Sequence, residues 1–164
     1  MNKTIAMIGH SAAGKSSCLV QLGFNLDATD MDHVLGTHQP PTMDRALDWL
    51  ATGRKYPENI VAVSNHENLL KELAAAKNAR PRKIQFDRIW FIYLRKPLAE
   101  LQNHLQLRQP NGENRNREGI NYTLQTFDRF DSDFFLQLQD EIVDCSGKSL
   151  ATIADEISVI AKSM

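Results

Sequence analysis

The sequence has few cysteines, no long apolar run and no excess of either charge. Its two cysteines, Cys18 and Cys145, lie far apart and match no metal-binding spacing, so we expect free, buried thiols in a reducing compartment. No apolar stretch approaches the ~20 residues that span a bilayer. The apolar segment at the start is too short for a signal peptide and lacks a cleavage site. We therefore expect a cytoplasmic protein with no membrane partner.

The near-neutral charge argues against a polyanionic partner. Nineteen Lys and Arg face twenty Asp and Glu, for a formal net charge of −1. This leaves no basic field to attract nucleic acid. A length of 164 residues, 42% of them hydrophobic, suits one domain with a real core. We expect a single domain over residues 1–164 that binds no nucleic acid and is a monomer or a weak homodimer.

Apolar segments with strand character alternate with helical segments along the chain. Strands are expected at 3–9, 24–32, 59–65, 88–96 and 140–147. Helices are expected at 14–24, 45–53 (capped by Thr42 or Asp44), 67–79, 98–108, 122–139 and 149–163. This alternation predicts an α/β fold with three layers (α/β/α) and a five-stranded, mostly parallel sheet. In such sheets, ligands bind beyond the carboxyl ends of the strands.

The stretch "GHSAAGKSS" follows the first predicted strand and opens the first predicted helix. It matches the phosphate-loop (Walker A) pattern G-x-x-x-x-G-K-[ST]. Glycines let consecutive backbone N–H groups turn toward an anion, and the helix dipole adds to the attraction. Lys15 is expected to reach the β- and γ-phosphates, and the Ser16 hydroxyl to ligate Mg²⁺. The predicted nucleotide-binding residues are Gly9, His10, Ser11, Ala12, Ala13, Gly14, Lys15, Ser16 and Ser17.

Two aspartates follow the loop, at the end of the second predicted strand. Asp30 and Asp32 are separated by one residue, so both can face a metal-rich cleft if the chain turns there. The alternative is a polar loop in which an aspartate caps a helix. With the phosphate loop, "DMDHVLG" (30–36) resembles the D-x-D loop of shikimate kinases and related gluconate kinase-like enzymes. That resemblance implies a P-loop NTPase fold, with Asp30 supporting Mg²⁺ and Asp32 contacting the acceptor hydroxyl.

Further segments are similar to the same family in their order. The segment 91–111 resembles its fourth strand, the following helix and the start of its lid, which implies that Arg108 points at the transferred phosphate. The resemblance likewise implies that Arg129 contacts the acceptor, and that 145–157 includes the loop beside adenine. The polar segment after residue 108 is either an ordinary surface loop or a mobile lid, placed at 108–120. Arg115 and Arg117 make that segment basic, and an Arg brought in by lid closure would stabilise the transferred charge.

The acceptor side departs from the family pattern. Where shikimate kinases have a run of glycines after the third strand, this chain has Ser64, Asn65 and His66, so the acceptor pocket must have another shape. Ser64 either holds a metal-bound water or caps a helix with Glu67 in a capping box. His66 either reaches the acceptor or is simply exposed. Arg45 and Arg54 are both possible matches for the family's acceptor-binding arginine.

These patterns together predict an ATP-dependent small-molecule kinase that uses Mg²⁺ and transfers the γ-phosphoryl group to a hydroxyl acceptor. Its catalytic residues would be Lys15, Asp32 and Arg108, with Ser16 and Asp30 at the metal. The acceptor would meet Asp32, Ser64, Asn65, His66 and Arg129. Two alternatives remain: a nucleoside or nucleotide kinase, and a nucleotide-binding regulatory protein that phosphorylates no acceptor.

Overall fold

Four parallel strands form the sheet in the part of the chain that the structure describes. The structure is a computed structural model, and it describes residues 3–36, 41–52, 59–107 and 115–164. The strands are β1 (Thr4–Ile8), β2 (Ile60–Ala62), β3 (Ile89–Arg95) and β4 (Glu141–Asp144), in the order β2-β1-β3-β4. Each neighbouring pair is parallel. The α/β class and the parallel sheet are therefore confirmed.

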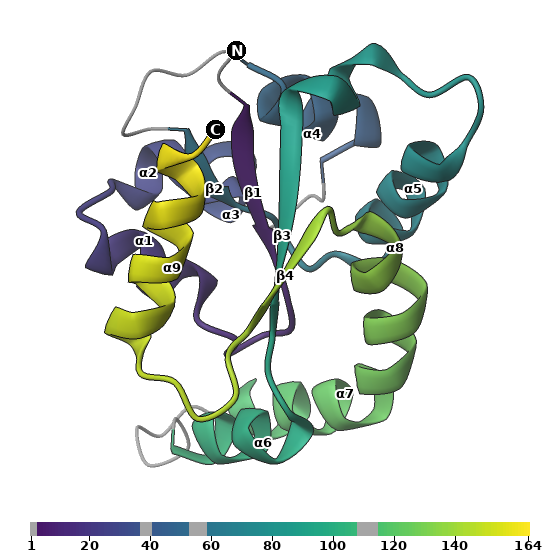
Figure 1. Ribbon diagram of the computed structural model, residues 1–164. Coiled ribbons are helices and arrows are strands. Elements are labelled where there is room, and N and C mark those ends of the chain that lie inside the picture. Colours follow the sequence, from purple (N-terminus) through teal and green to yellow (C-terminus); the bar gives the residue numbers. More distant parts are fainter. Residues whose placement is uncertain (1–2, 37–40, 53–58, 108–114) are drawn as a thin grey trace.

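The sheet is covered on both faces because successive strand residues alternate between two apolar clusters. Ala6 and Ile8 of β1 belong to one cluster, and Ile5 and Met7 belong to the other. All of β1 is buried, as expected for a strand between two helical layers. In Figure 1 helices lie on both sides of the strands.

One face is covered by the first and last long helices. Helix α1 (Lys15–Gln21) and helix α9 (Leu150–Lys162) pack together on the left of Figure 1. Ser149 begins α9 as an N-cap, its hydroxyl accepting from the backbone N–H of Thr152 at 3.2 Å. This cap satisfies a donor that the helix itself leaves unpaired.

The opposite face is covered by α4 (Met43–Leu50), α5 (Glu67–Asn78) and a later helical run. That run comprises a π-helix, η3 (Phe130–Phe135), and the short α8 (Leu136–Leu138). Thr42 caps α4 by accepting from the backbone N–H of Arg45, as predicted. A 3₁₀ helix, η1 (Ile84–Arg88), leads into β3.

Two helices lie beyond the carboxyl ends of the strands. Helix α6 (Leu98–Leu107) and helix α7 (Arg115–Arg129) contact each other at the bottom of Figure 1. Helix α7 begins at Arg115 rather than near Tyr122, so residues 115–120 of the expected lid are helical. Residues 108–114 lie outside the described part of the chain.

The predicted second strand at 24–32 is wrong. The segment forms two short helices, α2 (Leu26–Thr29) and α3 (Met31–Leu35). The Asn25 side chain accepts from the backbone N–H of Asp27, and that of Asp30 accepts from the backbone N–H of Asp32. Such local side-chain caps compete with strand pairing. What remains is one isolated parallel bridge between Asp30 and Ala62 beside β2, so the expected five strands become four in the described residues.

Two further expectations concern cysteine and membranes. Cys18 and Cys145 are buried and free, as predicted, and burial raises the pKa of Cys18 to about 11. Among the described residues, none of the helices combines the length and the apolar character that crossing a bilayer requires.

Candidate functional site: a glycine-containing loop facing two aspartates and an asparagine

The loop between β1 and α1 curls back on itself through two residues in the left-handed region. Gly14, immediately before α1, has φ 98°, and Ala12 has φ 68°. Glycine adopts this conformation without a steric penalty, whereas a residue with a Cβ pays for it. Strained backbone of this kind persists only where the surrounding structure enforces it, and it is found frequently at functional sites.

Gly9 lets the loop pass close to the neighbouring strand. A Cβ at this position would lie 2.9 Å from the carbonyl oxygen of Leu94 in β3, a distance that real Cβ atoms do not tolerate. The Gly9 carbonyl also accepts a hydrogen bond from Lys15. Gly9, the first glycine of the motif, therefore allows the loop to approach β3 closely, and its carbonyl positions Lys15.

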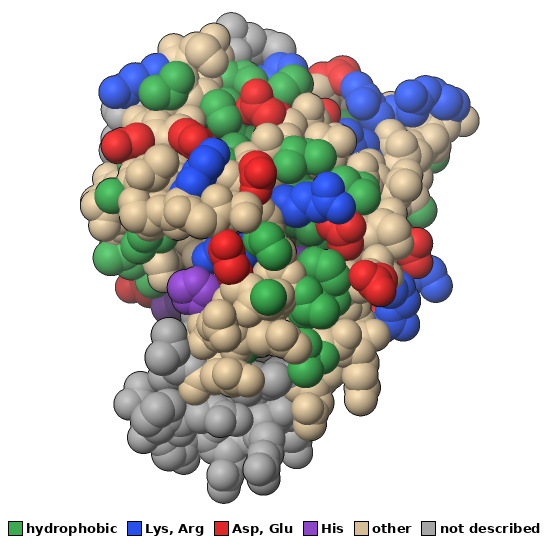
Figure 2. Space-filling view, turned by 60° about the horizontal axis from the view of Figure 1, so that its bottom comes forward, with side chains coloured by type: hydrophobic (Ala, Val, Ile, Leu, Met, Phe, Trp, Pro, Cys, Tyr) green, Lys and Arg blue, Asp and Glu red, His purple; other side chains and the backbone are tan. Residues whose placement is uncertain are grey.

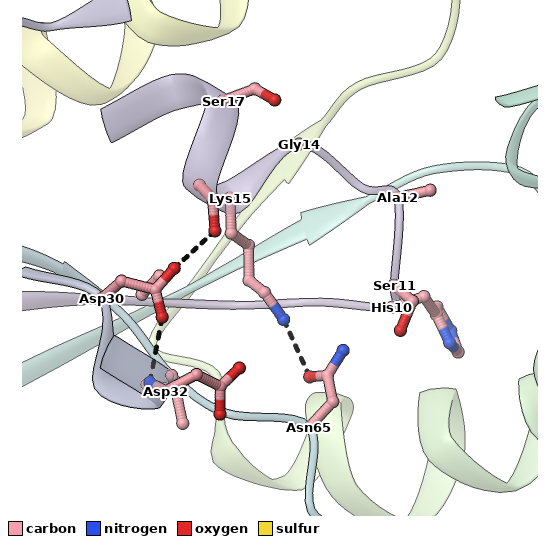
Figure 3. Close-up of a pocket in the computed structure, with 12 residues that line it drawn as sticks. His10, Ser11, Ala12, Gly14, Lys15, Ser17, Asp30, Asp32 and Asn65 are labelled. Atoms are coloured by element: carbon pink, nitrogen blue, oxygen red, sulfur yellow. Dashed lines mark hydrogen bonds between the residues drawn. The ribbon is translucent and has the colours of Figure 1, made fainter. Parts of the chain in front are cut away.

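The loop borders a pocket of about 290 Å³ at the carboxyl ends of the strands. The lining residues are His10, Ser11, Ala12, Gly14, Lys15, Ser16, Ser17, Asp30, Asp32, Ala62, Val63 and Asn65. Seven of the nine predicted nucleotide-binding residues are among them. The other two, Gly9 and Ala13, support the loop from behind, because Gly9 accepts from Lys15 and Ala13 is buried in the core. Figure 3 shows the residues that line the pocket.

Lys15 spans the pocket from the start of α1. Its Nζ donates to the Gly9 carbonyl at 2.7 Å and to Oδ1 of Asn65 at 2.8 Å. Desolvation lowers the pKa of Lys15 to about 8, and the charges of Asp32 and Asp30 oppose that shift. Lys15 thus remains mostly protonated at pH 7, with two neutral hydrogen-bond acceptors and no directly bonded counter-charge.

Ser16 and the two aspartates form a chain of hydrogen bonds. Ser16 Oγ donates to Oδ2 of Asp30 at 2.6 Å, and the Asp32 backbone N–H donates to Oδ1 of Asp30 at 2.9 Å. These two donors fix the Asp30 carboxylate, and the residue is only 6% exposed. In Figure 3 the Asp32 side chain projects into the pocket below Lys15. The structure thus brings together all three residues that the motifs suggested.

The chemistry of these oxygens fits a magnesium ion better than a softer metal. Hydroxyl and carboxylate oxygens are the ligands Mg²⁺ prefers, and it usually keeps several waters and takes others from phosphate. In the described residues there is no group of three or more His, Cys, Asp or Glu suited to a metal. Ser16 and Asp30 would therefore hold Mg²⁺ with the help of nucleotide phosphates rather than in a cage of protein ligands.

The segment after β2 contributes one predicted acceptor residue to the pocket. Asn65 lines it and holds Lys15, whereas Ser64 and His66 are not among the lining residues. Ser64 is 3% exposed. The alternative of Ser64 as a helix cap is wrong, because α5 begins at Glu67 with His66 in the capping position and no side-chain cap. The helix therefore begins two residues later than the capping-box pattern implied.

His10 is packed into an aromatic cluster behind the loop. Its ring stacks on Phe127 at 4.4 Å between centroids and meets Phe135 edge-on at 4.9 Å. Burial lowers the pKa of His10 to about 4, although Asp131 opposes that shift. The ring is therefore neutral at pH 7, and its Nε2 is buried without a hydrogen-bond partner. The His10 side chain therefore packs against these rings and leaves the loop backbone free.

Arg129 lies at the end of α7 and is paired with a residue that the sequence did not single out for the acceptor site. Its Nη2 lies 2.9 Å from Oε1 of Glu67, and the Tyr122 hydroxyl donates to Oε2 of Glu67 at 3.2 Å. Neither Arg129 nor Glu67 lines the main pocket. Arg54 and Arg108 lie outside the described residues, and the side chains of Arg115 and Arg117 are not described.

A second, smaller cavity adjoins the main pocket through shared residues. It measures about 60 Å³ and is lined by His10, Ser11, Asn65, Tyr122, Thr123, Thr126 and Phe130. Sequence reasoning missed the α7 residues of this set. The available signal was the spacing of Tyr122 and Thr126, which places them on one face of a helix.

Figure 2 brings the end of the molecule that carries the site forward. Acidic and basic side chains are interspersed over the middle of this view, without one extended patch of either sign. The near-equal numbers of basic and acidic residues in the sequence are thus also mixed in space on this face. Among the described residues on this face, charges of both signs therefore lie near one another.

The chain matches no family model, and no curated protein is significantly similar to it. Its function must therefore be argued from the pocket itself: a curled glycine-containing loop, one ammonium, two carboxylates and one amide at the carboxyl edge of a parallel sheet.

Proposed function

We propose that this protein is an ATP-dependent small-molecule kinase of the P-loop type, acting on a hydroxyl group. The observation that carries the proposal is that Lys15, the bonded pair Ser16 and Asp30, and the free side of Asp32 all face one pocket. A structural turn would require neither a half-buried lysine nor two carboxylates around the same space. The resemblance to shikimate kinase-like enzymes in the D-x-D loop supports the same reading.

The loop would bind the β- and γ-phosphates. Backbone N–H groups near Gly14 and the start of α1 offer donors to the phosphate oxygens. Lys15 would exchange its bonds to Gly9 and Asn65 for the γ-phosphoryl oxygens, since phosphate is the stronger, charge-assisted acceptor. Mg²⁺ at Ser16 and Asp30 would neutralise charge on the same phosphates.

Asp32 would orient the acceptor. A substrate hydroxyl placed against its carboxylate attacks the γ-phosphorus, the new O–P bond forms, and the bond to the bridging oxygen breaks to release ADP. The hydroxyl proton passes to Asp32 and then to solvent. Because the transition state is loose, positioning and charge stabilisation contribute more than base strength.

A screen for ADP formation tests the proposal directly. The full chain is incubated with ATP and Mg²⁺ and with sugars, polyols, sugar acids, shikimate, nucleosides and nucleotides in turn. Lys15→Ala serves as the blank. We expect at least one acceptor to raise ADP formation above the blank, and Asp32→Asn to lower that rate by 10²-fold or more. Acceptor-independent rates throughout, with Asp32→Asn unchanged, would contradict the proposal.

One observation favours a regulatory nucleotide-binding protein as a second candidate. Asn65 places a side chain beside Lys15 where the related enzymes have open glycine backbone. If that side chain occupied the acceptor's place, ATP would bind without transfer. This candidate predicts tight binding of ATP with Mg²⁺ in calorimetry, no productive acceptor, and a protein partner whose affinity changes with the nucleotide.

A further inference from the structure

The charges around the site restrict the kind of acceptor it can take. Among the described residues that line the main pocket and the adjoining 60 Å³ cavity, Lys15 is the one ammonium or guanidinium. Asp30 and Asp32 supply two carboxylates. Lys15 is needed for the transferred phosphoryl group, so no cation in this set remains for an anionic acceptor.

Arg129 is withdrawn from the acceptor by a specific contact. Glu67 holds it at 2.9 Å, and Tyr122 holds the other oxygen of the same carboxylate at 3.2 Å. The exposed ion pair alone would be weak. The tyrosine hydroxyl fixes the carboxylate from a second direction, on the side of the smaller cavity that Tyr122 lines. The Glu67 carboxylate thus offsets the charge of Arg129, which weakens the attraction that Arg129 would offer to an incoming carboxylate.

The smaller cavity offers neutral hydrogen-bonding groups instead. Thr123 and Thr126 are 6% and 8% exposed, and both line it with Ser11 and Asn65. Thr126 Oγ1 donates to the Tyr122 carbonyl at 2.6 Å. Hydroxyls and an amide can each donate or accept, which suits the hydroxyl groups of an uncharged compound. A volume of about 60 Å³ holds a hydroxymethyl-sized group or about two waters.

We propose that Glu67, by pairing with Arg129, sets the acceptor class of this site to neutral polyhydroxy compounds (a sugar, polyol or nucleoside) rather than carboxylates or phosphates. This inference rests on the proposed kinase function and narrows its substrate. Among the described lining residues an anion would meet no free counter-charge, and burying an unpaired anion is costly, whereas a neutral polyol meets no such penalty. Glu67 and Arg129 act here as specificity-determining residues, and neither takes part in the transfer itself.

The experiment compares matched acceptors that differ in charge. ADP formation is measured with a neutral sugar and its sugar acid, and with a nucleoside and its 5′-monophosphate. For the native chain we expect the neutral member of a pair to have a kcat/KM at least tenfold higher. Glu67→Gln should move that ratio toward the acid by about tenfold, mainly through a lower KM for the acid. Adding Arg129→Met to Glu67→Gln should abolish that gain.

Glu72→Gln is the matched control. It makes the same change on the exposed side of the same helix and should leave the ratio unchanged. Circular dichroism checks that each variant is folded. A native preference for the acid or the monophosphate, or a Glu67→Gln ratio equal to that of Glu72→Gln, overturns the inference while leaving the kinase function standing. If no acceptor exceeds the Lys15→Ala blank, the kinase function fails and the inference falls with it.

Discussion

The ammonium of Lys15 donates a 2.8 Å hydrogen bond to Oδ1 of Asn65, fifty residues further along the chain. The bond ties the loop after β1 to the segment after β2, and Figure 3 shows both side chains at the same pocket. An amide oxygen holds the lysine in place without cancelling its charge. The ammonium therefore stays available for an incoming phosphate, which is the stronger acceptor.

Asn65→Asp should weaken nucleotide binding. A carboxylate at this position would pair with Lys15 and compete with phosphate for it, so we expect the Kd for ATP with Mg²⁺ to rise at least tenfold in calorimetry. Asn68→Asp adds the same charge at an exposed position of α5 and should change the Kd less than twofold. Equal effects of the two variants would show that the added charge acts at long range and not through Lys15.

Nucleotide affinity should fall as pH rises through 8. Desolvation holds the pKa of Lys15 at about 8, so the free protein loses this charge above that pH, while phosphate binding requires it. We expect the Kd for ATP to be about tenfold higher at pH 9 than at pH 7. Titrations in buffers of different ionisation enthalpy should detect proton uptake on binding near pH 8. Lys15→Met should bind weakly at both pH values and show no such uptake.

His10 should make the fold less stable in mild acid. Its pKa is about 4 in the folded protein against 6.5 for an unperturbed histidine. Between these values the unfolded chain binds the proton and the folded protein does not, so stability falls as pH falls from 6.5 to 4. For this 4% exposed ring the loss amounts to about 3 kcal/mol.

Urea unfolding of His10→Phe, which keeps the aromatic stack, measures this contribution. The variant should lose less stability than the native chain over the same pH interval. His33→Phe is the control, because His33 is about half-exposed beside Asp27. An equal pH slope for native protein and His10→Phe would mean that His10 is not the group responsible.

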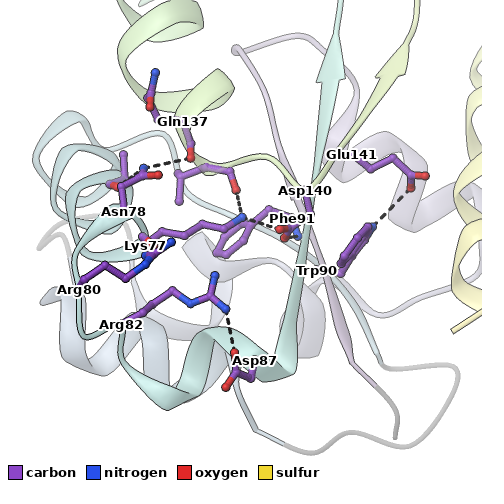
Figure 4. Close-up of polar contacts among 12 residues, drawn as sticks. Lys77, Asn78, Arg80, Arg82, Asp87, Trp90, Phe91, Gln137, Asp140 and Glu141 are labelled. Atoms are coloured by element: carbon purple, nitrogen blue, oxygen red, sulfur yellow. Dashed lines mark hydrogen bonds and ion pairs between the residues drawn. The ribbon is translucent and has the colours of Figure 1, made fainter.

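Lys77 and Asp140, which lie outside the pocket, should stabilise the fold through direct contacts. Lys77 Nζ donates to Asp140 Oδ1 at 2.8 Å and to the Leu138 carbonyl, and the Phe91 backbone N–H donates to Asp140 Oδ2 at 2.8 Å. Figure 4 shows this contact between α5, β3 and the chain entering β4. Burial lowers the pKa of Lys77, and its bond to Asp140 opposes that shift.

Lys77→Met leaves the Asp140 carboxylate without its cation in a largely buried place. We expect a loss of about 3 kcal/mol in the free energy of unfolding, measured by urea titration. The exposed pair Arg82 and Asp87 provides the comparison, since Arg82→Met should cost less than about 1 kcal/mol. Both variants should keep the native Kd for ATP, because neither residue lines the pocket.

The glycine-containing loop over 9–14, with the strand before it and the helix after it, could be predicted because the signal for this local structure is local. The apolar run ending at Ile8, the glycines and Lys15 occupy adjacent positions, and backbone geometry alone decides how they curl. The helices over 67–78, 98–107 and 150–162 were likewise predictable from composition and periodicity. Asp30 and Asp32 were placed at the pocket correctly, even though the strand expected to carry them does not form.

The strand over 24–32 failed for a local reason that composition conceals. Asn25 and Asp30 cap two consecutive helical turns with their own side chains, and this option competes with sheet pairing. The pairing of Glu67 with Arg129 could not be predicted for a different reason. The two residues lie in different helices and meet only in the folded protein. No sequence pattern around Glu67 or Arg129 indicates that the two side chains pair.

The sequence by itself determined that a glycine-containing loop follows a buried strand, opens a helix and carries Lys15 and Ser16, because each of these features depends on neighbours a few residues away. Only the tertiary structure decided that Asn65 holds Lys15, that His10 is neutral within an aromatic cluster, and that Glu67 occupies Arg129. Those relationships join segments far apart in the chain. They arise because α5 covers one face of the sheet while α7 lies beyond the carboxyl ends of the strands, an arrangement that no local pattern encodes.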